Sequence, residues 1–168
     1  HPEPPNRQTG RIWPHAGATR EPAFFSAEVH RARRFYPDLN PAAPERLAVV
    51  CAGVEHMAPH YHVRRARFPY WCVEFVARGE GTLRLGRPGD TVLSPTAKTS
   101  PLMPGAVFAY RPGIPHDIRT DPRRPLVKYF VNFVGSAGAR LLRPPGPRPG
   151  EIVQCTAADH LVQLFEDL

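Results

Sequence analysis

The sequence predicts a mainly β protein, built as a sandwich or barrel of short strands. The 168 residues include 22 prolines and 13 glycines. Proline is disfavoured inside helices and central strands, which argues against a helical bundle. Short apolar or alternating runs recur along the chain with turn residues in each gap, as in all-β domains. Hydrophobic residues make up 42% and charged residues 22%, so the chain can bury the core of one globular domain.

Each predicted strand is defined by its apolar pattern and by the turns that bound it. Residues 47–54 are a continuous apolar run, typical of a buried strand. Residues 60–66 alternate, so Tyr61, Val63 and Arg65 share one face and the intervening residues share the other. Gly-Glu-Gly at 79–81 predicts a hairpin. The expected strands are one within 24–39, then 47–54, 60–66, 71–78, 82–85, 91–94, 106–110, 116–120 and 126–134, with 95–105 as a loop.

The two ends of the chain differ from this β region. Residues 1–23 are polar and interrupted by Pro and Gly, which predicts an N-terminal arm before a barrel over 24–142. Ser136 would cap a short helix within that barrel. A proline-rich connector is expected over 143–155 and an amphipathic helix from 156 to 168.

The last helix has a capping-box pattern and a continuous apolar stripe. Thr156 and Asp159 form the capping pattern. The stripe consists of Leu161, Leu164, Phe165 and Leu168. It runs to the last residue, and the chain begins with His1 rather than Met, so we expect the natural chain to be longer than this sequence.

The charge distribution and the cysteines indicate which partners and which cellular compartment to expect. The 22 Lys and Arg outnumber the 15 Asp and Glu, for a net charge of +7, but the basic residues are spread along the chain and form no nucleic-acid patch. Cys51 and Cys72 lie in apolar runs and are expected to be buried thiols. Free thiols and the lack of a signal peptide or an apolar run of membrane-spanning length predict a cytoplasmic protein without a membrane partner.

The histidines raise the question of a metal. His60 and His62 lie on one face of a strand, and Glu74 and His116 follow, as in the metal site of a cupin jelly roll. The spacing between the histidine pair and Glu74 does not match the cupin pattern, which would place the pair within 67–70. Only Glu74 and His116 then fit, and two ligands seldom hold a metal. We therefore expect no metal or other cofactor.

A longer pattern resembles the sensor domain of AraC-family transcriptional regulators. RGEGTLRL is followed by PGAVFAYRPGIPHDIRTDPRRPLVKYFVNFVG, and together they contain four marks of that family. These are the Gly79–Gly81 hairpin, the Pro104–His116 turn and strand, the Asp121–Pro125 turn and the aromatic strand from Tyr129 to Phe133. The resemblance covers residues 45–145.

This resemblance implies a cupin-like jelly-roll barrel with an N-terminal arm and a C-terminal helix. In the family, the barrel binds a small effector, the arm can close over it, the C-terminal helices form a homodimer, and the protein is not an enzyme. A separate domain with two helix-turn-helix motifs binds DNA. That domain is absent from this chain and is expected beyond Leu168.

The resemblance also implies a pocket with a few polar groups and an aromatic floor. Candidate polar ligand contacts are Arg65, for which Arg64 competes, Glu74, His116 and Lys128. Candidate aromatic contacts are Phe130, Trp71, Tyr61 and Tyr110, with Trp13 as a lid from the arm. Such a set suits a sugar or a similar metabolite. For Glu74 the alternative is an outward position or an arginine partner, and for His116 it is a bond to a nearby backbone carbonyl.

Two other functions remain open. The first is a metal-dependent cupin enzyme, a dioxygenase or isomerase, using His60, His62, Glu74 and His116. The second is a stand-alone carbohydrate-binding jelly-roll module, for which the chain would need no DNA-binding extension.

Overall fold

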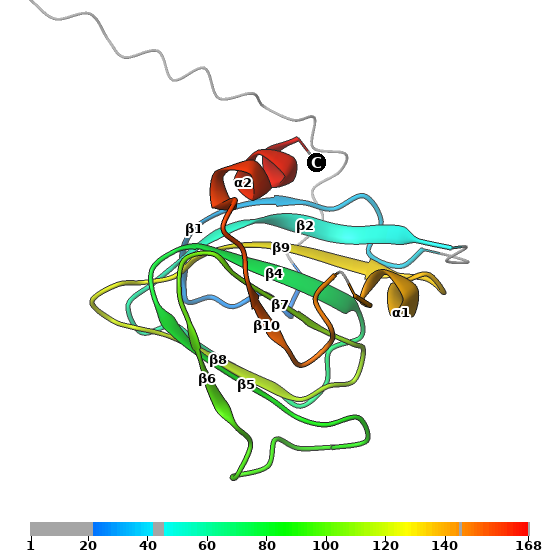
Figure 1. Cartoon of the computed structure of the whole chain (residues 1–168), viewed down its shortest axis with the longest axis horizontal. Helices are drawn as coiled ribbons and strands as arrows, with labels where there is room; N and C mark the ends of the chain where they lie inside the picture. Colours follow the sequence, from blue (N-terminus) through cyan, green and yellow to red (C-terminus); the bar gives the residue numbers. More distant parts are fainter. Residues whose placement is uncertain (1–21, 42–45, 145, 168) are drawn as a thin grey trace, which may run out of the picture.

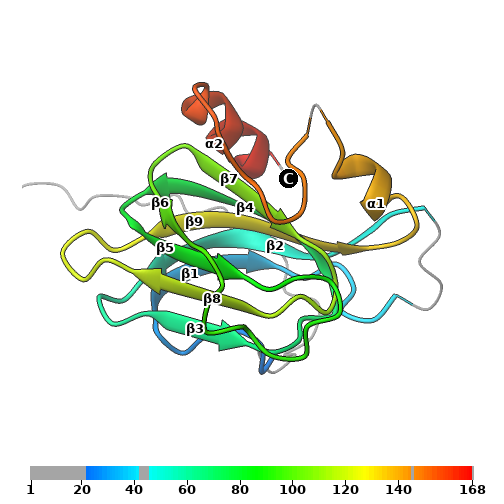
Figure 2. The ribbon, with the colours of Figure 1, turned by 60° about the horizontal axis from the view of Figure 1, so that its bottom comes forward.

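The computed structural model describes residues 22–41, 46–144 and 146–167. Its strands form two antiparallel sheets that face each other (Figures 1 and 2). The larger sheet has the order β1-β2-β9-β4-β7-β10, with bounds Val29–Phe35, Ala48–Met57, Val127–Val134, Trp71–Arg78, Ala106–Tyr110 and Ile152–Gln154. The smaller sheet has the order β3-β8-β5-β6, with bounds His62–Arg65, His116–Thr120, Gly81–Leu85 and Thr99–Leu102.

The connections between strands are those of a jelly roll. From β2 to β9 the chain crosses from one sheet to the other at every step except the β5–β6 hairpin. The predicted fold class, mainly β and of the jelly-roll type, is confirmed. Among the described residues, no helix is long and apolar enough to cross a membrane.

Alternation along the central strands decides what reaches the space between the sheets. In β4 and β9 every second side chain points inward, and these inward positions are 72, 74 and 76 in β4 and 128, 130 and 132 in β9. Because β4 pairs with β9 so that Glu74 lies opposite Phe130 and Val76 opposite Lys128, the two charged side chains are diagonal neighbours. Register and alternation therefore bring Glu74 and Lys128 together.

An apolar core fills the remaining space between the sheets. Its fully buried members include Phe108, Leu83, Ile118 and Leu126. Cys51 and Cys72 are also buried and are free thiols, as predicted.

Helix α2, Ala158–Glu166, covers part of the outer face of the larger sheet (Figure 1). Leu161 and Phe165 pack against Phe75 and Tyr129, and the Phe75 and Phe165 rings stack with centroids 6.3 Å apart. The Tyr129 hydroxyl donates a 2.7 Å hydrogen bond to Glu166. Part of the predicted apolar stripe thus packs on the chain's own sheet, whereas Leu164 is 51% exposed.

Two strand predictions need correction. Residues 91–94 form no strand, and the edge position beside β5 is taken by β6, which lies in the segment predicted as a loop. The Arg84 guanidinium donates to the carbonyls of Ser94, Pro95 and Ala97 and holds residues 94–97 in a turn. These contacts are one reason why residues 91–94 do not form the edge strand. The connector predicted over 143–155 contains β10, which pairs with β7.

The start of the barrel and the two helix caps also differ from prediction. The strand expected within 24–39 begins at Val29, and residues 24–28 precede it without strand pairing. Helix α1, Gly138–Leu141, begins after Ala137 and α2 begins after Ala157, and neither has a side-chain cap. The cap at Ser136 and the Thr156–Asp159 capping box are therefore not formed.

Candidate ligand-binding pocket

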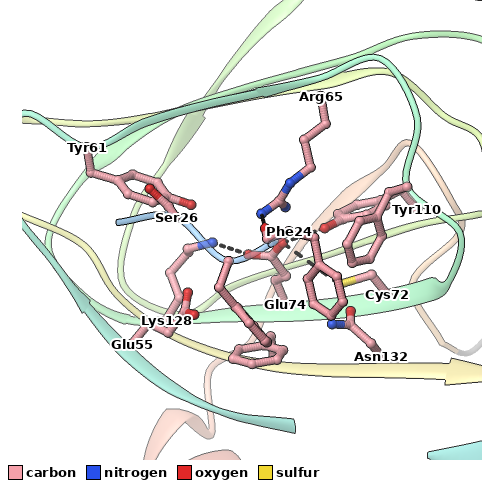
Figure 3. A pocket seen from close by; sticks show the side chains of 13 residues that line it. Phe24, Ser26, Glu55, Tyr61, Arg65, Cys72, Glu74, Tyr110, Lys128 and Asn132 are labelled. Atoms are coloured by element: carbon pink, nitrogen blue, oxygen red, sulfur yellow. Dashed lines mark hydrogen bonds and ion pairs between the residues drawn. The ribbon is translucent and has the colours of Figure 1, made fainter. Parts of the chain in front are cut away.

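A small polar pocket lies between the two sheets, where their facing strands meet residues 24–26 (Figure 3). Figure 3 shows Tyr61, Arg65, Tyr110 and Lys128 pointing toward the same space from different sides. The free volume is about 30 Å³, room for about one or two water molecules. The lining residues are Phe24, Phe25, Ser26, Glu55, Tyr61, Arg65, Phe68, Cys72, Glu74, Tyr110, Lys128, Phe130 and Asn132.

A buried ion pair forms the floor of the pocket. Lys128 Nζ donates to Glu74 Oε2, and the Tyr110 hydroxyl donates a 2.8 Å hydrogen bond to Glu74 Oε1. Burial alone would raise the pKa of Glu74, but the Lys128 ammonium and the two hydrogen bonds more than offset it and the pKa is lowered. Burial would lower the pKa of Lys128, but the Glu74 carboxylate reverses this and the pKa is raised. Both groups are therefore charged at neutral pH.

Arg65 extends from β3 over the opposite side of the pocket. Its Nη2 donates to the main-chain carbonyl of Phe24, and its Nη1 lies 3.5 Å from His116 Nε2. The guanidinium carbon lies 5.1 Å from the centre of the Phe68 ring, a cation–π contact. The competing candidate, Arg64, points to the other face of β3 and bonds Asp117.

His116 is fully buried just behind Arg65. Its Nδ1 lies 3.1 Å from the Ile114 carbonyl, so Nδ1 carries the proton and Nε2 faces Arg65 as an acceptor. Burial, together with the positive charge of Arg65, lowers the pKa of His116 to about 4. The imidazole is therefore neutral at pH 7. The alternative expected from the sequence, a bond to a nearby backbone carbonyl, is what the structure shows.

Because the pKa of His116 is lowered in the folded protein, we expect the protein to lose stability in mild acid. In the unfolded chain its pKa is near 6.5 and in the folded chain about 4, so the unfolded state binds more protons between these values. The free energy of unfolding should fall as pH drops from 6.5 to 4, by on the order of 3 kcal/mol. Urea denaturation of His116→Gln across this range should give a flatter profile than wild type. His60→Gln, in an exposed turn, is the control and should keep the wild-type slope.

Two more polar groups line the pocket beside the ion pair. Glu55 Oε1 lies 2.8 Å from Nη2 of Arg34 on β1, and this ion pair balances the charge of the carboxylate. Asn132 donates from Nδ2 to Cys51 Sγ at 3.1 Å. Its buried Oδ1 has no hydrogen-bond partner within the described part of the chain. A buried acceptor of this kind is costly, so a donor on a ligand or a water is expected there.

Residues 24–26 close the mouth of the pocket. Phe24 packs edge-on against Phe68 and Tyr70, at centroid distances of 5.7 and 5.8 Å. Phe25 lies 5.8 Å from Phe130 and under the guanidinium of Arg34. With this segment in place, the free volume of the pocket is too small for a ligand the size of a monosaccharide.

The structure brings together six of the nine candidate ligand contacts named from the sequence. These six are Tyr61, Arg65, Glu74, Tyr110, Lys128 and Phe130. His116 stands behind Arg65 and does not line the pocket. Trp71 lies on the outer face of the larger sheet against Gly138, because odd positions of β4 point outward. Trp13 lies outside the described residues.

Sequence reasoning missed several lining residues. Asn132 shares a face with Lys128 and Phe130, so alternation along β9 could have found it. Glu55 lies one residue past the strand predicted over 47–54, whereas β2 continues to Met57. Nothing in the sequence indicates that the segment around Phe24 folds back into the mouth.

The residues of a cupin metal site do not assemble. His62 points to the outer face of the smaller sheet, where its Nε2 lies 3.1 Å from Asp117, and His60 is exposed in a turn. Glu74 is engaged by Lys128 and Tyr110. Across the ranges that the structure describes, no group of three or more His, Cys, Asp or Glu could hold a metal. The donor set therefore does not fit a cupin metal.

Solved structures with similar folds share little sequence with this chain. YhaK from Escherichia coli has a TM-score of 0.51 at 12% identity, covering 76% of this chain and 52% of its own. Oxalate decarboxylase from Bacillus subtilis has a TM-score of 0.46 at 15% identity, covering 62% of this chain and 25% of its own. The chain thus spans about half of YhaK and a quarter of the decarboxylase. The likeness to YhaK shows a shared fold only.

Sequence comparison is more specific about the family. No curated protein matches the chain. The family model described as "AraC-like ligand binding domain" matches residues 49–168, which includes every strand of the two sheets except β1 and the first residue of β2. The match agrees with the jelly-roll topology and with a polar pocket between the sheets. The chain therefore belongs to the family of AraC-like ligand-binding domains.

Proposed function

We propose that the chain is the effector-sensing and dimerisation domain of an AraC-type transcription regulator in the cytoplasm. In this proposal its DNA-binding domain lies outside the sequence given, and the chain catalyses no reaction. The observation that carries the proposal is the pocket itself, because it places a buried ion pair and an unsatisfied amide oxygen at the closed end of a ligand-binding fold. Buried polar groups placed in this way are typical of sites that orient a small ligand.

Sensing requires two arrangements with different affinities for the effector. In the arrangement described here, residues 24–26 fill the mouth of the pocket. An effector the size of a monosaccharide needs more than the present 30 Å³, so it would bind an arrangement in which this segment has moved. The effector would shift the protein toward that arrangement.

Helix α2 would form the dimer surface. Its inner side packs on Phe75 and Tyr129, which fixes its position on the sheet. Leu164 on its outer side is 51% exposed, and Val153 on the nearby edge strand β10 is 42% exposed. Exposed apolar side chains on a fixed helix suit a helix-to-helix contact between two copies.

A ligand screen with two variants tests this proposal. We expect a small metabolite, sugars included, to raise the melting temperature by about 5–10 °C at 100 times its dissociation constant, equivalent to about 2.7 kcal/mol. Phe130→Trp fills the pocket and should remove the shift. Leu164→Lys should keep the shift but sediment as a monomer. A shift that survives Phe130→Trp would place the ligand elsewhere, and an unchanged dimer in Leu164→Lys would rule out the α2 interface.

A further inference from the structure

Arg65 is the one charged pocket residue that no opposite charge balances within the described part of the chain. Glu74 is paired with Lys128, and Glu55 with Arg34. The nearest groups to the Arg65 guanidinium are the Phe24 carbonyl, the neutral His116 ring and the Phe68 ring. The pocket and its immediate partners therefore hold three cations against two carboxylates.

The contact to Phe24 is a weak substitute for an anion. A guanidinium has five donors in a planar fork that matches a carboxylate with two parallel hydrogen bonds. Here the fork receives one carbonyl oxygen, and its other arm lies 3.5 Å from His116 Nε2, at the limit of a hydrogen bond. Because His116 is neutral, it does not change the local charge.

We propose that the effector carries one carboxylate, which binds Arg65 in place of the Phe24 carbonyl. This inference rests on the proposed sensing function. The remainder of the ligand would carry at least one hydrogen-bond donor, because the free Oδ1 of Asn132 accepts only a donor. A small hydroxy acid or sugar acid has this combination.

Binding in this way couples the ligand to the segment at the mouth. In the proposed complex the carboxylate takes the place of the Phe24 carbonyl at Nη2 of Arg65, so the Phe24 main chain moves away when the acid binds. Phe24 and Phe25 would then withdraw from Phe68 and Phe130, and the pocket would gain the volume of their rings.

Matched pairs of compounds test the carboxylate directly. The panel pairs galacturonate with galactose, gluconate with sorbitol, lactate with 1,2-propanediol, and 4-hydroxybenzoate with 4-hydroxybenzyl alcohol. Calorimetric titration at pH 7 should show one acid binding about ten- to a hundredfold more tightly than its neutral partner, as expected for charge-assisted hydrogen bonds. The preference should disappear in Arg65→Gln and persist in Arg64→Gln, which changes the outer face of the same strand.

Arg65→Lys and circular dichroism separate a binding effect from misfolding. A folded Arg65→Lys protein should keep part of the preference, because the charge remains and the fork is lost. If Arg65→Gln is unfolded, the binding data for Arg65→Lys decide whether Arg65 is responsible for the preference for the acid. Equal binding of acid and neutral partner, or a preference unchanged in the Arg65 variants, would overturn the inference. Binding of neutral members alone would overturn it while leaving the sensing function in place, and a panel with no binder would count against both.

Discussion

Lys128→Met is expected to lower the free energy of unfolding by about 3–5 kcal/mol. The substitution leaves the Glu74 carboxylate, 3% exposed, without its cationic partner in the interior, with only the Tyr110 hydroxyl and the weak Cys72 thiol as donors. An unpaired buried charge is costly because neither water nor a counter-ion solvates it. Urea denaturation at pH 7, followed by circular dichroism at fixed protein concentration, measures the loss.

Two matched variants isolate the effect of burial. The double variant Glu74→Gln with Lys128→Met removes both charges and should be more stable than Lys128→Met alone, because no unpaired charge is left. Arg124→Met breaks the Arg124–Glu80 pair, whose side chains are 60% and 30% exposed, and should cost about 1 kcal/mol or less. If Lys128→Met costs no more than Arg124→Met, the buried ion pair is not present.

Phe75→Ala is expected to cost about 3–5 kcal/mol and to loosen α2. Phe75 is fully buried on the outer face of the larger sheet, between Tyr129 and Phe165. Removing the ring leaves a cavity under the helix and takes away its main aromatic contact. Amide hydrogen exchange should then be faster in α2 than in β4 or β9, since α2 is attached to the sheet largely through this cluster.

Phe35→Ala is the control for the Phe75 variant. Phe35 lies at the end of β1 and is 48% exposed, so its truncation removes little buried area. It should change stability by about 1 kcal/mol or less, with α2 exchange unchanged. Equal losses in the two variants would show that Phe75 is not the anchor of α2.

The parts of the fold that follow from alternation were predictable. In residues 60–66, alternation correctly placed Tyr61 and Arg65 on one face, and the structure shows both lining the pocket. Along β9, alternation places Lys128, Phe130 and Asn132 on one face, and all three line the pocket. The sensor-domain resemblance is confirmed for the ligand-binding domain by the family match over 49–168.

The remaining features depend on contacts that local patterns do not encode. The choice of residues 99–102 as the partner of β5 depends on long-range pairing and on Arg84, which bonds the carbonyls of the preceding loop. Trp71 was expected in the pocket because of its residue type, but its position in β4 turns it outward. The placement of Phe24 in the mouth depends on rings from distant segments, Phe68 and Tyr70.

A crystal structure of the chain with a compound from the ligand screen tests the central claim most directly. We expect the compound between Arg65 and the Glu74–Lys128 pair, within hydrogen-bond distance of Asn132 Oδ1, with Phe24 displaced from the mouth. A second hollow of about 580 Å³, between β6 and β10, is lined by Met103, Lys98 and Ile152 among others. A compound bound there, with Phe24 still on Arg65 and the pocket between the sheets closed, would contradict the assignment of the effector site.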